Sequence, residues 1–194
     1  MAQPSARSWA ETLEIGRRGE AVLDAVFGPE FIIVKATRDH ERQGVDRFFV
    51  HRRDGRLIHR VDFKTDEAAG RTGNLALEHV SVVRHGRRAV DGWVHATIAD
   101  LIIAFVPALD RAFVLAVPAL RAAWPDILRC FPPRLAATSD RGGYQTLVCC
   151  VPIPWLREAR LVVREVDAVN AQLRLPLTVA APRPRARRPP PIDW

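Results

Sequence analysis

The first clear pattern of apolar and polar positions is helical and covers residues 8–27. A Ser and a Glu three residues apart open this segment as a capping box, and a Gly-Pro pair ends it. Steps of three and four residues define an apolar stripe on the helix, and Glu20 lies on that stripe. Because charged groups are seldom buried alone, Glu20 either faces the core beside a partner or a metal ion, or lies at the margin and reaches solvent, Arg17 or Arg18.

Strand patterns dominate the chain from there to residue 151. Runs rich in apolar, β-branched and aromatic residues predict strands at 31–35, 45–52, 57–64, 75–83, 101–106, 112–117 and 144–151. A helix is expected at 118–124, where a proline interrupts it, and a shorter one at 153–160. Helices mix with strands along the whole chain, which predicts an α/β fold.

The second and third predicted strands form an antiparallel hairpin around an Asp-Gly turn. Facing residues then have numbers that sum to about 108 for a three-residue loop, or about 109 for a two-residue loop. The first register places Asp46 beside Asp62, and the second places it opposite Phe63 unless a bulge intervenes. Strand alternation puts Lys64 on the same face as Asp62, so the sequence predicts a compact group of charged side chains.

Composition restricts the fold and the partners. With 194 residues, 48% of them hydrophobic, the chain can bury one core, so we expect one domain at 8–175, a flexible start at 1–7 and a disordered Pro/Arg-rich tail at 176–194. A net charge of +7 favours a polyanionic partner, although charge alone does not separate DNA, RNA and acidic membrane. Three cysteines without a pairing pattern, no leader and no membrane-spanning apolar run predict a soluble cytoplasmic protein.

Lys64 stands out because only two of the 29 basic residues are lysines. Lysine carries a compact ammonium whose pKa shifts readily on burial, whereas arginine is a permanently charged fork. A lysine two residues after a carboxylate therefore indicates chemistry, although Lys35, the other lysine, has no evident role and chance placement stays open.

Four residues from one helix and two paired strands can converge on one spot: Glu20, Asp46, Asp62 and Lys64. Packed carboxylates repel and raise one another's pKa unless a cation is present. Magnesium prefers oxygen ligands and is commonly held by one or two carboxylates together with phosphate oxygens of a substrate. The group is therefore suited to hydrolysis of phosphate esters, in which Lys64 would orient a water molecule made more acidic by the metal.

These residues resemble the motif of the PD-(D/E)XK nuclease superfamily. The sequence has Gly16-Arg-Arg-Gly-Glu20 on the helix, Gly44-Val-Asp46 on a strand and Asp62-Phe-Lys64 on the next, although Val45 stands where a proline is common. The resemblance, which extends to uncharacterised phage-associated members, implies a restriction-endonuclease-like mixed central sheet flanked by helices. It also implies hydrolysis of DNA with Mg²⁺ or Mn²⁺, often by a dimer.

Carried over residue by residue, the resemblance makes Asp46 and Asp62 metal ligands and Lys64 the residue that orients water. Glu20 would be a further ligand, directly or through water. Glu78 could join this site from the neighbouring strand, or be a surface carboxylate on an edge strand. The DNA substrate could be double-stranded or branched.

A basic segment after the fourth strand contains Arg84, Arg87 and Arg88. These side chains could grip phosphates, although runs of charge are usually solvated. The Pro/Arg-rich tail could add DNA affinity or act only as a solubilising end.

Two other functions are compatible with the sequence. The chain could be a catalytically silent DNA-binding module that retains the fold and the basic surface. It could also be an α/β domain whose acidic residues form ion pairs with its many arginines.

Overall fold

The structure is a computed structural model that describes residues 9–84, 87–136 and 145–169. Its helices are α1 (Trp9–Phe27), α2 (Arg38–Arg42), α3 (Ala69–Thr72), α4 (Trp93–Ala96), the 3-10 turn η1 (Pro107–Leu109), α5 (Val117–Ala122), α6 (Trp124–Cys130) and α7 (Ile153–Glu158). Its strands are β1 (Phe31–Lys35), β2 (Arg47–His51), β3 (Leu57–Thr65), β4 (Asn74–Arg84), β5 (Arg87–Asp91), β6 (Leu101–Val106), β7 (Arg111–Ala116), β8 (Arg134–Ala136), β9 (Gln145–Pro152) and β10 (Val162–Asp167).

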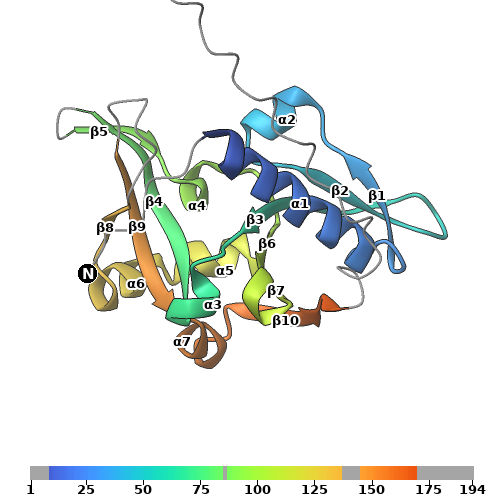
Figure 1. Cartoon of the computed structure of the whole chain (residues 1–194). Coiled ribbons are helices and arrows are strands. Elements are labelled where there is room, and N and C mark those ends of the chain that lie inside the picture. The colour runs from blue at the N-terminus through green and yellow to red at the C-terminus, as the bar shows by residue number, and fades with distance from the viewer. Residues whose placement is uncertain (1–8, 85–86, 137–144, 170–194) are drawn as a thin grey trace, which may run out of the picture.

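The strands form two sheets (Figure 1). Sheet A has the order β1-β2-β3-β6-β7-β10 and is mixed, because β3 and β6 run parallel while the other neighbours are antiparallel. Sheet B has the order β5-β4-β9-β8 and is antiparallel throughout. The predicted α/β fold with a mixed central sheet flanked by helices is therefore confirmed.

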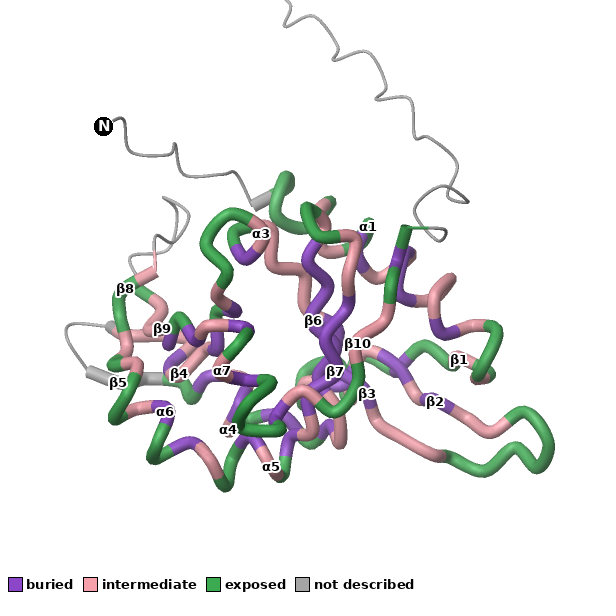
Figure 2. Tube along the Cα trace, turned by 90° about the horizontal axis from the view of Figure 1, so that it is seen from below, coloured by how far each residue is buried: buried purple, intermediate pink, exposed green. Residues whose placement is uncertain are grey.

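Sheet A separates two hydrophobic cores. On one face α1 packs with Phe49, Phe63 and Phe105. On the other face Ile102 and Phe113 pack with residues of sheet B and of helices α4 to α7. Most residues of β6 and β7 are buried, as their purple stretches in Figure 2 show. Successive side chains of a strand point to opposite faces, so these strands contribute to both cores.

The hairpin of β2 and β3 has the register that the three-residue loop predicts. Arg47 pairs with Val61, and the numbers of paired residues sum to 108 from there to Phe49. The register shifts between Phe49 and Val50. Asp46 continues this register by donating its amide to the Val61 carbonyl at 2.8 Å. Because β2 begins only at Arg47, β3 runs on to Thr65 beyond its partner, and the predicted acidic residues lie at this fork.

Several elements differ from the sequence-based prediction. Part of the segment 39–44, where the sequence is polar, belongs to α2. The segment 84–88 was expected as a basic loop after the fourth strand, but Arg84 ends β4 and Arg87 and Arg88 begin β5. Sheet A also gains β10, a half-exposed strand that the apolar pattern does not single out. The predicted tail at 176–194 and the flexible start at 1–7 lie outside the described residues.

Candidate active site at the fork of β2 and β3

Asp62 is the most deeply buried charged residue at the fork. It is 1% exposed, and its Oδ1 accepts a hydrogen bond from the Lys64 ammonium at 2.7 Å. Its second oxygen, Oδ2, is also buried and has no hydrogen-bond partner among the described residues. Burial and the neighbouring Asp46 outweigh the attraction of Lys64 and raise the pKa of Asp62 to about 7. An unsatisfied buried carboxyl oxygen is costly, so this atom is a place for a proton or a cation.

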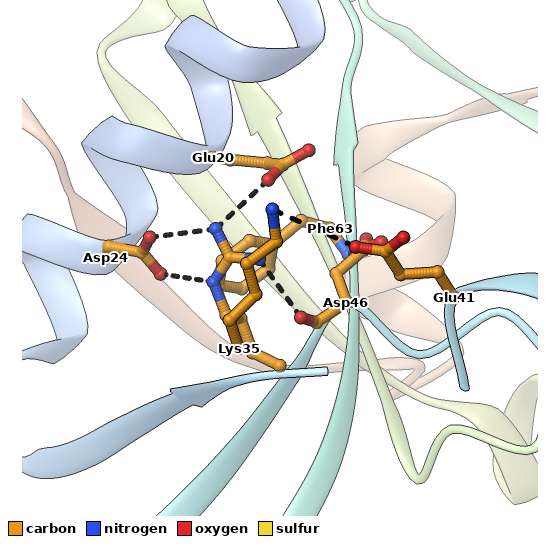
Figure 3. Close-up of polar contacts among 7 residues, drawn as sticks. Glu20, Asp24, Lys35, Glu41, Asp46 and Phe63 are labelled. Carbon is orange, nitrogen blue, oxygen red and sulfur yellow. Dashed lines mark hydrogen bonds and ion pairs between the residues drawn. The ribbon is translucent and has the colours of Figure 1, made fainter. Parts of the chain in front are cut away.

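Asp46 is fixed beside Asp62 by a backbone contact. One oxygen of its carboxylate accepts the amide of Phe63 at 2.8 Å, in the stretch of β3 that β2 does not cover (Figure 3). Asp46 is also one of the groups that raise the pKa of Asp62. Two carboxyl groups thus share the fork, one held by a backbone amide and the other by an ammonium.

Lys64 is within reach of solvent and of the acidic group. Its side chain is about one-third exposed, at 35%. Burial works against the ammonium, but the carboxylates of Asp62, Asp46 and Glu78 outweigh it and raise the pKa of Lys64. Lys64 therefore stays protonated and can donate hydrogen bonds.

Glu78 comes to this group from sheet B. It is half-buried on β4, which lies between β5 and β9, so the expectation of an edge strand is wrong. Its carboxylate accepts hydrogen bonds from the Ser81 hydroxyl and from the amide of Trp93. The carboxylate is thus held at the start of α4 while its charge acts on Lys64.

Glu20 has a different partner from the other predicted site residues. Its carboxylate accepts a hydrogen bond from Arg47 Nη2 at 3.0 Å, while Asp24, one turn further along α1, binds the same guanidinium at 2.9 Å through both oxygens (Figure 3). Arg47 also donates to the Asp46 carbonyl at 3.0 Å and lies over the Phe63 ring. Strand alternation puts this cluster on the α1 face of sheet A.

Asp62 and Lys64 lie on the opposite face of sheet A from this cluster. They pair in register with Ile102 and Ala104, whose side chains belong to the core shared with sheet B. The structure thus brings Asp46, Asp62, Lys64 and Glu78 together and engages Glu20 with Arg47. The ion-pair alternative raised by the sequence describes Glu20, but neither Asp62 nor Asp46.

The position of α1 over the fork depends on Gly19. A Cβ added there would lie 1.9 Å from Thr65 Oγ1, so only glycine permits this approach of the helix to the end of β3. Arg47, Asp24 and Gly19 are the residues that the sequence analysis missed. Asp24 and Gly19 had a signal in the sequence, as a carboxylate one helical turn after Glu20 and a glycine directly before it, whereas Arg47 had none.

The residues present fit a hard cation. Within the described residues, no group of three or more His, Cys, Asp or Glu side chains is arranged to hold a metal ion. Magnesium needs fewer, because it is commonly bound by one or two carboxylates with water and substrate phosphate as further ligands. Asp46 and Asp62, with the unpartnered Oδ2, supply such a pair.

Arg84, Arg87 and Arg88 lie at the turn between β4 and β5, where Arg84 pairs with Arg87 in the backbone register. Their side chains lie outside the described residues, so phosphate binding there stays a prediction. In the described part of the chain, no helix has both the length and the apolar character of a membrane span.

Comparison with known proteins gives a weak structural likeness. No protein-family model and no curated protein matches the chain. A solved structure of a bacterial homing endonuclease, I-Ssp6803I, aligns over 79% of this chain and 95% of that chain, with a TM-score of 0.40 and 18% sequence identity. At these values the likeness assigns no family to the chain.

Proposed function

We propose that the chain is a metal-dependent nuclease that hydrolyses phosphodiester bonds of DNA at the fork of β2 and β3. The observation that carries this proposal is the buried Asp62, whose Oδ2 has no partner among the described residues while Lys64 holds Oδ1 at 2.7 Å. Burying an unsatisfied carboxyl oxygen lowers the stability of the fold, so a proton or a cation bound at this atom is favoured.

Asp46 and Asp62 are the residues that would hold Mg²⁺ or Mn²⁺. When bound, the ion supplies positive charge that stabilises the charge developing on the phosphate and acidifies water. The Phe63 amide already holds the Asp46 carboxylate in place, so this side chain loses little conformational freedom when it binds the metal ion. Glu78 is an auxiliary acid, and Glu20 joins the site only through water or after leaving Arg47.

Lys64 is the residue that orients the attacking water. Its ammonium stays charged, is partly exposed and is held by one bond to Asp62, which leaves further N–H groups free to donate to water or to a phosphate oxygen. Lysine can rotate these donors toward a reacting oxygen, whereas the planar fork of arginine presents them in fixed directions.

DNA is the proposed partner because the chain is strongly basic. The net charge of +7 favours a polyphosphate, and Arg84, Arg87 and Arg88 are proposed phosphate contacts at the end of the β4–β5 hairpin. Homodimer formation and a cytoplasmic location stay predictions.

A cleavage assay tests the proposal. Wild-type protein incubated with DNA and Mg²⁺ or Mn²⁺ should cleave it and should stop when EDTA removes the metal. Lys64→Ala should lose cleavage. Lys35→Ala is the matched control, because Lys35 is 70% exposed and its ion-pair partner is Glu41 at 3.9 Å (Figure 3).

The pattern of activity across these proteins decides between the candidate functions. Equal cleavage by wild type and Lys64→Ala would refute the mechanism. Tight, salt-sensitive DNA binding with no metal uptake and no cleavage would favour the silent DNA-binding module.

A further inference from the structure

The hairpin of β2 and β3 has the proposed site at its open end and an exposed basic turn, residues 52–56, at the other end. The last pair between β1 and β2 joins Phe31 to His51, so the basic turn continues beyond the end of sheet A. All of its residues are exposed, and Figure 2 shows it as a green loop that projects away from the rest of the chain. The basic turn is therefore open to a ligand that lies along the hairpin.

Hydrogen bonds hold the backbone of the basic turn in place. Asp54 Oδ1 accepts the amide of Arg56 at 3.0 Å and lies 2.9 Å from His51 Nδ1. The His51 amide donates to the Arg56 carbonyl at 2.9 Å. Arg52 donates to the carbonyl of Gly28, just after the end of α1, and so ties the basic turn to the helix. The other arginine side chains of the turn are thus presented from a defined backbone.

The guanidinium groups of Arg53 and Arg56 are available to a ligand. The basic turn holds three arginines and one aspartate, a net charge of +2. On α6 the aspartate Asp126 binds the guanidinium of Arg129 at 2.8 Å, but Asp54 binds a backbone amide instead. That amide, of Arg56, is the main cause that lowers the pKa of Asp54, whereas the charge of the Arg56 guanidinium is the weakest. Among the described residues, neither guanidinium of this pair makes a hydrogen bond or a salt bridge.

We infer that the basic turn binds the phosphate backbone of double-stranded DNA that flanks the nucleotide at the proposed site. This rests on the proposed function, which supplies DNA as the ligand. Arg56 and Asp62 are six residues apart in sequence, which corresponds to about 20 Å along an extended strand. Duplex DNA rises about 3.4 Å per base pair, so a duplex bound at the site reaches the basic turn after about six base pairs. Arginine suits this contact because its fork matches the oxygens of a phosphate.

The salt dependence of DNA binding tests the basic turn. The affinity of the full chain for a fluorescein-labelled duplex, several times longer than the expected spacing, is measured in EDTA at a series of KCl concentrations. Each arginine–phosphate contact that is lost should reduce the slope of log affinity against log salt concentration by about 0.9. Arg53→Ala combined with Arg56→Ala should therefore reduce the slope by about 1.8.

Two control variants distinguish a phosphate contact from a change in total charge. Arg17→Ala combined with Arg18→Ala removes the same charge from exposed positions of α1, which covers the face of sheet A opposite to Asp62. This variant should keep the wild-type slope. Arg53→Lys combined with Arg56→Lys should also keep it, because an ammonium still neutralises a phosphate. All the substituted side chains are exposed, so thermal unfolding of each variant should match that of wild type.

The outcomes separate this inference from the proposed function. A wild-type slope in the alanine variant of the basic turn, or an equal fall of the slope in the α1 variant, would overturn the inference even if wild type cleaves DNA. The expected fall without any metal-dependent cleavage by wild type would refute the nuclease and leave the basic turn as a DNA contact. A wild type that neither binds nor cleaves DNA would overturn both.

Discussion

The Lys64 ammonium donates to Asp62 Oδ1 at 2.7 Å, while the other oxygen of the same carboxyl group is buried without a partner among the described residues. Two other acids of the chain are bound by arginine forks. Arg60 binds both oxygens of Asp100, and Arg157 binds both oxygens of Glu165. The Lys64–Asp62 pair, by contrast, leaves one buried oxygen without a partner among the described residues, which is the arrangement expected where a further ligand binds.

Replacing Lys64 with arginine should abolish cleavage although the positive charge is retained. The guanidinium is larger than an ammonium and has fixed donor directions. It would bind both oxygens of Asp62 and occupy the space of the attacking water. We expect a fall in kcat of at least about 100-fold, the usual contribution of a positioned donor at a developing charge. Single-turnover cleavage of DNA with saturating Mn²⁺ measures it.

Measurements of DNA binding show whether the fall in kcat of Lys64→Arg reflects the chemical step or weaker binding of DNA. DNA affinity in EDTA should stay within about twofold of wild type, because the net charge is unchanged. A Lys64→Arg protein that cleaves at the wild-type rate would contradict the role of Lys64.

The raised pKa of Asp62 should make the metal-free protein less stable as the pH rises from about 4 to about 7. In this range the unfolded chain has released the Asp62 proton while the folded protein still holds it. The folded state binds more protons, so the free energy of unfolding falls with pH and levels off above the folded pKa. The effect is at most about 4 kcal/mol, at 1.36 kcal/mol per pKa unit.

Urea unfolding in EDTA between pH 4 and 8 measures this slope. Asp62→Asn removes the titrating group and should flatten the profile, so the variant gains stability relative to wild type as the pH rises. Asp126→Asn is the matched control, since Asp126 is exposed and pairs with Arg129 on its own helix. Parallel profiles for wild type and Asp62→Asn would show that Asp62 ionises normally in the fold.

Periodicity predicted α1 and the strands β1 to β4, β6, β7 and β9, because these elements bury one face or both. The continuous apolar run at Leu101–Val106 is buried on both sides, and the hairpin has one of the two registers that the Asp-Gly turn allowed. In contrast, β10 alternates weakly and is held in sheet A by pairing with β7. Such an edge strand depends on its neighbour, so local sequence does not specify it.

The site was predictable where it depends on strand alternation and was missed where it depends on packing between elements. Asp46, Asp62 and Lys64 follow from a register of two adjacent strands. Glu20 required the rotation of α1, which Gly19 and Thr65 fix by contact, and its partner Arg47 comes from a strand 27 residues away. No period in the sequence encodes a contact of that kind.

Arg47→Lys should destabilise the fold by about 1–3 kcal/mol and loosen Asp46. The guanidinium joins Glu20 and Asp24 to the Asp46 carbonyl, and the side chain is only 8% exposed. An ammonium keeps the charge but cannot span these partners, and a buried charge left partly unpaired is costly. Denaturant unfolding measures the stability, and hydrogen exchange of the Phe63 amide measures the order of Asp46.

Arg60→Lys is the control that distinguishes loss of Asp46 positioning from the general effect of weakening an ion pair. Arg60→Lys weakens the pair with Asp100, which is about 40% exposed on both sides, so it should cost less than about 1 kcal/mol. This variant should leave the hydrogen-exchange rate of the Phe63 amide unchanged. Unchanged Phe63 protection in Arg47→Lys would mean that Arg47 stabilises α1 without positioning Asp46.

The two glycines of α1 should respond to alanine in opposite directions. At Gly19 the new methyl group would collide with Thr65, and overpacking of this kind costs about 1–3 kcal/mol. At Gly16 there is open space, so alanine should stabilise the helix by about 0.5–1 kcal/mol. Thermal unfolding of both variants measures the difference, and Gly19→Ala combined with Thr65→Ala should recover most of the loss, because the second change removes the atoms that collide. An equal response at both positions would show that α1 does not approach β3 through Gly19, and the fork would then lack the helix that brings Glu20 to Arg47.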